Sequence, residues 1–227
     1  MPYLLLLVLL FVILLGPQIW VQRVMSRYHR DPEENFPGNG AQLARHLLDR
    51  LQLQGVGVET TRQGDHYDPV TRAVRLTDDK FNGRTLTSIA TAAHEVGHAI
   101  QHAANDPLLR WRTRLVGLTG FAQRLGSFLL FAAPFLTLLS RAPSVGAITL
   151  LAAFLVMGAN LLVQLITLPV EWDASFNKAL PLLKAGYLSP AQQRGAERIL
   201  RAAALTYLSA SLAGLLNFWR WLQVLKR

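Results

Sequence analysis

Cysteine is absent from this 227-residue chain, and charged side chains are scarce. Without cysteine there is no disulfide and no thiolate ligand, so a bound metal must be held by histidine and carboxylate side chains. Only 16% of the residues are charged and 51% are hydrophobic, whereas soluble domains are about a quarter charged. The composition therefore indicates a membrane protein. The net charge of +9 fits basic flanks of membrane segments better than a nucleic-acid-binding surface.

Acidic residues are missing altogether from residue 107 to residue 170. This region contains two long apolar runs, Leu115–Leu139 and Val145–Leu168, separated by the short segment Ser140–Ser144. Each run is long enough to cross a bilayer, so we expect a transmembrane helical hairpin over residues 115–168. The lack of intramembrane acids argues against a transporter or pore.

The N-terminus carries another apolar run, which continues past Gly16-Pro17 to Trp20. A cleavable signal peptide is the alternative, but no basic residues precede the run and no small-x-small cleavage site follows it. We therefore expect a retained transmembrane anchor over residues 1–22. Because Arg23 and Arg27 follow directly, the positive-inside rule places the N-terminus outside and the next segment in the cytoplasm.

The C-terminal third alternates between polar and apolar character. Residues 169–201 are rich in lysine and arginine and are expected to be cytoplasmic, and residues 202–227 form a last span or a helix lying in the membrane interface. The predicted fold is a mainly α membrane protein with three to four transmembrane helices. It would be a multi-pass protein of the cytoplasmic (inner) membrane, and the pattern carries no signal for its oligomeric state.

Residues 23–114 form the only sizeable polar stretch and are predicted to be a small cytoplasmic α+β unit. Its pattern predicts helices over Ala41–Leu53 and Thr85–Ala104, with alternating strands at Val56–Thr61 and Val70–Thr77 between them. We expect the two strands to form a hairpin, whose Val70–Thr77 strand offers an edge to an extended substrate.

The second of these helices carries His94-Glu95-Val96-Gly97-His98, an H-E-x-x-H sequence. Four residues make about one helical turn, so both imidazoles lie on one face and can share a metal ion. Glu95 falls beside them, where its carboxylate reaches a metal-bound water. Two histidine ligands and a general base are the arrangement of zinc hydrolases. Zinc is favoured over manganese or cobalt by ligand type and abundance.

A catalytic zinc needs a third protein ligand. His102 is excluded because it lies eight residues from His94, about 12 Å along a continuous helix. Glu171 and Asp173 are the first acids after the long apolar hairpin, and either is a candidate. The plain alternative is that both are solvated residues at the end of a membrane helix.

The sequence resembles the YugP-type neutral zinc metallopeptidases of bacterial membranes over nearly its whole length. The resemblance rests on the N-terminal anchor and on Asp65–Pro69, Ala92–His102, Leu168–Ser175 and Ala202–Leu208. The motif order is also similar to that of HtpX-type membrane peptidases, in which a downstream E-x-x-A-D supplies a glutamate ligand. The resemblance implies that Glu171 is the third ligand of a gluzincin-like site. Ser175 replaces the aspartate of that motif, so Asp173 or Ser175 would support a histidine.

The expected function is hydrolysis of peptide bonds in membrane or membrane-proximal proteins, by a zinc-bound water that Glu95 activates. Protein or peptide substrates and the lipid bilayer are the expected partners, and nucleic acid is not. Further support of the transition state is expected from residues that carry a suitable donor: His66, Tyr67 and Tyr207. The alternative is a membrane scaffold or chaperone that holds zinc without catalysis, but such a protein has no need of Glu95 between the histidines.

Overall fold

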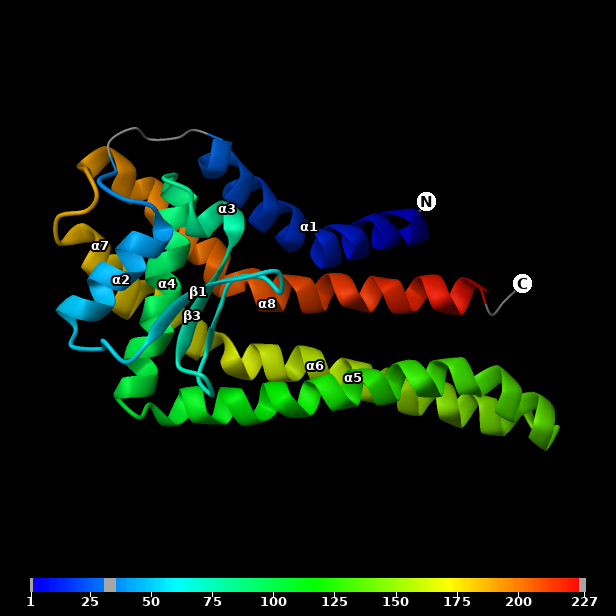
Figure 1. Ribbon diagram of the computed structural model, residues 1–227. Helices are drawn as coiled ribbons and strands as arrows, with labels where there is room; N and C mark the ends of the chain where they lie inside the picture. The colour runs from blue at the N-terminus through cyan, green and yellow to red at the C-terminus, as the bar shows by residue number, and fades with distance from the viewer. Residues whose placement is uncertain (1, 31–35, 225–227) are drawn as a thin grey trace. The chain divides into compact units, whose positions relative to one another are not determined.

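The computed structural model describes residues 2–30 and 36–224, most of which are helical. The helices are α1 (Pro2–Arg30), α2 (Gly40–Arg50), α3 (Asp78–Phe81), α4 (Leu86–Ala103), α5 (Pro107–Ser140), α6 (Pro143–Trp172), α7 (Leu180–Lys184) and α8 (Pro190–Val224), and a π-helix, η1 (Asp173–Ala179), joins α6 to α7. The strands are β1 (Gly57–Thr61), β2 (His66–Asp68) and β3 (Ala73–Thr77). Figure 1 follows this order along the chain. A mainly α fold with a small sheet agrees with the prediction.

The chain divides into two compact units. One consists of residues 1–18, 111–167 and 207–227, and the other of residues 19–110 and 168–206. We call the second the H-E-x-x-H unit, because it contains the helix with that motif. Four helices (α1, α5, α6 and α8) begin in one unit and end in the other. Residue 202, where we expected a boundary, lies inside the continuous helix α8.

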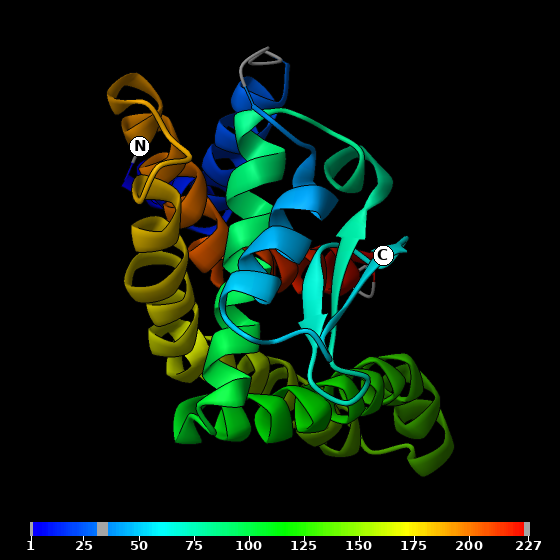
Figure 2. The same ribbon diagram turned by 60° about the vertical axis from the view of Figure 1, so that its left-hand side comes forward.

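Helix α4 is the centre of the H-E-x-x-H unit. Thr85 caps its N-terminus, with its hydroxyl accepting a hydrogen bond from the Ser88 amide at 3.2 Å. The helix is buried along almost its whole length, with α2, β3 and η1 packed around it, and Figure 2 shows α2 and the strands beside it. Small residues such as Ala90, Ala93 and Ala99 are completely or almost completely buried on it. They let neighbouring elements approach α4 closely, so the histidines lie in a core and not on a surface.

The sheet differs from the expected hairpin. Its strand order is β1-β3-β2, with β1 parallel to β3 and β2 antiparallel to β3. The additional strand is β2, which contains His66 and Tyr67 and lies between two turns. Tyr67 is buried, and its hydroxyl is hydrogen-bonded to His102. Both edges of β3 are already paired. The prediction that an extended substrate adds to the Val70–Thr77 strand is therefore wrong. The edges of this sheet are β1 and β2.

Helix α1 contains one segment long and apolar enough to cross a membrane. Within the described residues this segment, Val8–His29 with a mean hydropathy of 1.7, is the single candidate span. The expected hairpin is present as α5 and α6, joined at residues 141–142, with Gly146 lying against Thr137. Their described apolar segments, Arg124–Ser140 and Pro143–Ala153, are shorter than a full span. By helix length and composition, one span is supported where three to four were expected.

Candidate metal centre

Helix α4 presents His94 and His98 on one face, with Glu95 next to His94 in the sequence. The exposed fractions of His94, Glu95 and His98 are 3%, 5% and 2%, respectively. The imidazole rings of His94 and His98 lie edge to face, with centroids 4.8 Å apart. The helix predicted from the sequence over 85–104 thus places the pair as expected, one turn apart.

Glu171 comes to this face from the last turn of α6. Its Oε2 atom lies 3.3 Å from His94 Nε2 and 3.2 Å from His98 Nε2, and only 1% of the residue is exposed. One ligand atom from each of the three residues lies within 4.8 Å of the other two. Among the described residues this is the group of histidines and acids compact enough to hold one ion. Asp173 and His102 do not belong to it.

The imidazole of His94 is oriented by Ser175, a residue of η1. His94 Nδ1 lies 3.0 Å from Ser175 Oγ, and the same hydroxyl donates to the Leu200 carbonyl at 3.0 Å. Because its single proton goes to Leu200, Ser175 must accept from His94. The hydrogen-bond network therefore assigns the proton of neutral His94 to Nδ1 and leaves a lone pair on Nε2, facing Glu171.

His98 is oriented in the same sense by Gln101. Its Nδ1 atom lies 2.9 Å from Gln101 Oε1, which can only accept. The amide orientation of Gln101 is set by its Nε2 group, which donates to the Val170 carbonyl at 2.9 Å and to Asp173 Oδ2 at 2.8 Å. Neutral His98 is thus also protonated at Nδ1, with the Nε2 lone pair facing Glu171.

Asp173 is the far end of this chain of hydrogen bonds. Burial alone would raise the pKa of its carboxyl, but hydrogen bonds from Gln101 and Asn177 and the nearby charge of Lys178 more than offset that effect and lower the pKa. Asp173 is therefore an ionised acceptor that holds the Gln101 amide in place. It acts on His98 through Gln101 and does not touch the imidazole itself.

The three groups lie at separations that suit ligands of one metal ion. The Nε2 atoms of two imidazoles approach one carboxylate oxygen at 3.2 and 3.3 Å, while the Nδ1 atoms of both rings are hydrogen-bonded to Ser175 and Gln101. Ligands placed tetrahedrally at about 2.0–2.1 Å from zinc are roughly 3.3 Å apart. The donor set, the protonation pattern and these separations all fit a zinc ion. His94, His98 and Glu171 would hold it.

The close approach of η1 to α4 depends on Gly97. A Cβ atom built on Gly97 would lie 2.5 Å from the carbonyl oxygen of Ala174, a distance at which backbone must move. The π-helical turns of η1 begin directly after α6 and place Ser175 against His94. Such wide turns are frequent at functional sites. Here the local geometry brings Glu171 to both histidines and Ser175, four residues later, to His94.

The other residues predicted to support the transition state, His66, Tyr67 and Tyr207, contact groups outside the His94–His98–Glu171 cluster. His66 donates from Nδ1 to the Gly64 carbonyl at 2.8 Å, and the Tyr67 hydroxyl lies 2.7 Å from His102 Nδ1. Burial raises the pKa of Tyr67, so its phenol is neutral. Tyr207 belongs to the other unit, where Arg112 lies over its ring at 5.3 Å. Each of these residues has a partner away from the Glu171 carboxylate.

Two residues of this site were missed by sequence reasoning. Gln101 follows His98 by three residues, which puts both on one helical face, so helical spacing was the signal that could have found it. Gly97 lies inside the motif, but nothing in the local sequence indicates that a backbone from residue 174 passes over it. Its role comes from tertiary packing alone.

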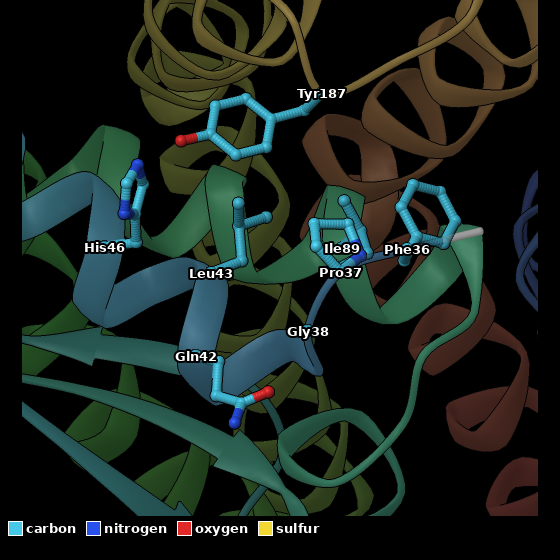
Figure 3. A pocket seen from close by; sticks show the side chains of 8 residues that line it. All are labelled: Phe36, Pro37, Gly38, Gln42, Leu43, His46, Ile89 and Tyr187. Atoms are coloured by element: carbon cyan, nitrogen blue, oxygen red, sulfur yellow. The ribbon is translucent and has the colours of Figure 1, made fainter. Parts of the chain in front are cut away.

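A hollow near the N-terminal half of α4 is separate from the metal-binding group. It measures about 380 Å³ and is mostly apolar, with Leu43, Ile89 and Tyr187 among its lining residues. Figure 3 shows these side chains together with His46, whose ring lies 5.7 Å from that of Tyr187. None of His94, His98 and Glu171 lines it.

The buried His–His–Glu group on an H-E-x-x-H helix defines the class of zinc-dependent hydrolases. The chain belongs to the family described as "Putative neutral zinc metallopeptidase", whose profile matches residues 3–226. It is 33% identical over 216 residues, 92% of either chain, to the "Putative membrane protease YugP" of Bacillus subtilis (strain 168). No solved structure matches. The resemblance inferred from the motifs is confirmed, and membership of a peptidase family implies a protein or peptide substrate.

Proposed function

We propose that this protein is a membrane-anchored zinc metallopeptidase that hydrolyses peptide bonds of membrane or membrane-proximal proteins. The observation that carries the proposal is the approach of the Nε2 atoms of His94 and His98 to one Glu171 oxygen, at 3.3 and 3.2 Å. That arrangement fits a shared metal ion, and the family to which the chain belongs is one of zinc peptidases. The apolar segment Val8–His29 and the printed name of the B. subtilis relative support a membrane location. We place the site on the cytoplasmic side because Arg23 and Arg27 lie at the C-terminal end of this segment.

Each residue of the group has a distinct task. His94, His98 and Glu171 hold the ion, which, when bound, polarises the scissile carbonyl and lowers the pKa of water. Glu95, next to His94 in the sequence and almost fully buried, accepts a proton from the attacking water and passes it to the leaving amine. Ser175 and Gln101 keep both imidazoles in the tautomer that leaves Nε2 free for the ion.

The test separates metal binding from catalysis. Glu95→Gln has nearly the same shape and is not one of the three ligands, so zinc content should stay near one ion per chain. Peptide hydrolysis should fall about 10²–10⁴-fold, the usual contribution of a general base. Zinc content is measured on purified full-length protein, and hydrolysis with a quenched fluorescent peptide library.

The control is Glu171→Gln, which should lose both zinc and hydrolysis, while re-addition of zinc should not restore activity. If Glu95→Gln hydrolyses peptides as fast as the parent, the proposed mechanism is wrong. If the parent binds zinc and cleaves no peptide, the non-catalytic scaffold is the better description.

A further inference from the structure

The H-E-x-x-H unit contains a second cavity, between α1 and α8, in which arginine is the commonest lining residue. It measures about 450 Å³. It is lined by Trp20, Arg23, Val24, Arg27, Tyr28, Arg198 and Arg201. The lining contains no carboxylate and no histidine. The cavity therefore has a net positive lining, and none of the three residues of the metal centre belongs to it.

The lining residues share one face of each helix. On α1, Trp20, Arg23 and Arg27 follow one another at intervals of three and four residues, which is the spacing of a single helical stripe. On α8, Arg198 and Arg201 are three residues apart and also face the same way. All four arginines are exposed. Two basic stripes thus meet across one cavity.

The two helices are fixed against each other beside the cavity. Gly195, one turn before Arg198, lies so close to the neighbouring elements that a Cβ there would be 3.0 Å from the Tyr28 ring and 2.6 Å from Leu86. On the other side, Thr87 of α4 donates to the Met25 carbonyl of α1 at 3.1 Å. Packing therefore fixes the spacing of the two helix faces that carry the arginines, so ligand binding has to order only their side chains.

The positive charge of this cavity is not neutralised within the part of the chain that the structure describes. None of its four arginines forms an ion pair with a described carboxylate. Glu197, the neighbour of Arg198 on α8, is paired with Lys184 at 2.8 Å. The Arg27 guanidinium lies 5.9 Å from the ring centroid of its neighbour Tyr28. Positive charges that line one cavity repel one another, and an anion bound among them would relieve that repulsion.

The place of the cavity along α1 indicates where the anion comes from. Arg23 and Arg27 lie in the last turns of the candidate membrane span Val8–His29, directly after its apolar part. Trp20 and Tyr28 line the same cavity, and such amphipathic rings are enriched at the headgroup level of bilayers. Basic pockets at the cytoplasmic ends of membrane helices take lipid phosphates.

We propose that this cavity binds the phosphate-bearing headgroup of an anionic phospholipid of the membrane in which α1 is anchored. The guanidinium groups donate paired hydrogen bonds to the phosphate oxygens, a geometry that arginine offers and lysine does not. The bound lipid holds α1 to α8 beside the core that carries α4. This inference does not depend on hydrolysis by the metal centre.

The test measures lipid binding to the full-length protein in detergent by native mass spectrometry, with phosphatidylglycerol and phosphatidylcholine as probes. The parent should bind phosphatidylglycerol at least about tenfold more tightly than phosphatidylcholine. Since each basic residue near an anionic lipid changes binding about fivefold, Arg198→Gln with Arg201→Gln should weaken phosphatidylglycerol binding about 30-fold. The phosphatidylglycerol affinity of Arg198→Lys with Arg201→Lys should lie between those of the parent and the glutamine pair. The reason is that lysine keeps the charge but cannot form the paired hydrogen bonds.

A matched control removes the same charge elsewhere in the H-E-x-x-H unit. Arg62→Gln with Arg84→Gln changes two exposed arginines that do not line the cavity, and lipid binding should stay within about twofold of the parent. Thermal unfolding of every variant shows whether it is folded. If the glutamine pair is not folded, the lipid affinity of the lysine pair tests the proposal in its place. The proposal is overturned if the glutamine pair binds phosphatidylglycerol like the parent. It is also overturned if equimolar sn-glycerol 1-phosphate displaces the lipid, since the site would then be one for soluble phosphates.

Discussion

Gly97 of α4 lies directly against the backbone of Ala174 in η1. A Cβ at position 97 would meet the Ala174 carbonyl oxygen at 2.5 Å and its Cα at 3.1 Å. Glu171, the third ligand, lies three residues before Ala174, and Ser175, which bonds to His94, follows it directly. The distance between the two backbones therefore decides whether the third ligand reaches the histidines.

Gly97→Ala should therefore damage both stability and metal binding. Overpacking of a closed contact costs about 1–3 kcal/mol, and the displaced η1 carries Glu171 and Ser175 away from His94. Thermal unfolding and zinc titration of the purified protein measure the two effects. Gly117→Ala is the matched control, since this glycine is also helical and a Cβ added there would have nothing within 4 Å. Zinc affinity equal to the parent in Gly97→Ala would contradict this account.

Gln101→Leu should lower zinc affinity about 10–100-fold, the usual cost of removing a residue that orients a histidine ligand. The substitution keeps the buried volume but removes both the acceptor for His98 Nδ1 and the donor to Asp173. Competition with a fluorescent chelator measures the affinity. Asp173→Asn keeps an acceptor oxygen for Gln101 and should cost less. The control is Gln54→Leu, which should leave zinc affinity unchanged. Gln54 is exposed and is not part of α4.

The turn between β2 and β3 should make stability depend on pH through Asp68. Burial alone would raise the pKa of its carboxyl, but hydrogen bonds from the Val70 and Thr71 backbones and from the Thr71 hydroxyl, with the charge of Arg75, lower the pKa overall. A lowered folded-state pKa means that the ionised carboxylate stabilises the fold above pH ~4. That contribution is lost as the pH falls through the folded-state pKa.

Asp68→Asn should therefore lower the unfolding midpoint by about 1–4 °C at pH 7, as expected for a partly exposed ion pair in a chain of this size. The difference from the parent should shrink as the pH is lowered from 6 to 3, because the parent then loses the same charge. Calorimetric scans at several pH values measure this trend. A difference that grows toward acid pH would have the wrong sign.

The absence of native cysteine allows a direct test of the expected membrane topology. Arg62→Cys and Ser189→Cys lie in segments proposed to be cytoplasmic, whereas Ser144→Cys lies where α5 turns into α6. A membrane-impermeant maleimide should label Ser144→Cys in intact cells and the other two only after permeabilisation. All three positions are exposed, so labelling reports sidedness. Protection of Ser144→Cys in intact cells would show that the α5–α6 hairpin does not cross the bilayer.

Local patterns predicted the elements that depend on neighbouring residues. The H-E-x-x-H helix, its Thr85 boundary and α2 were recognisable because amphipathic spacing and capping act within a few residues. The order of the strands could not be recognised from local patterns. A short strand such as His66–Asp68 is stabilised by the contact of Tyr67 with His102, 35 residues away. The number of membrane spans expected from hydropathy exceeds the one segment that the described helices support.

The sequence alone determined the ligand pair His94 and His98, the neighbouring base Glu95 and, through the family resemblance, the expectation that Glu171 completes the group. Helical periodicity requires no knowledge of the rest of the fold. The tertiary structure decided how the histidines are held: Ser175 on His94, and Asp173 acting on His98 only through Gln101. It also placed four arginines from two ends of the chain around one cavity. Such contacts between distant segments depend on packing at Gly97, where the missing side chain lets the Ala174 backbone approach, and at Gly195, where it makes room for the side chains of Leu86 and Tyr28.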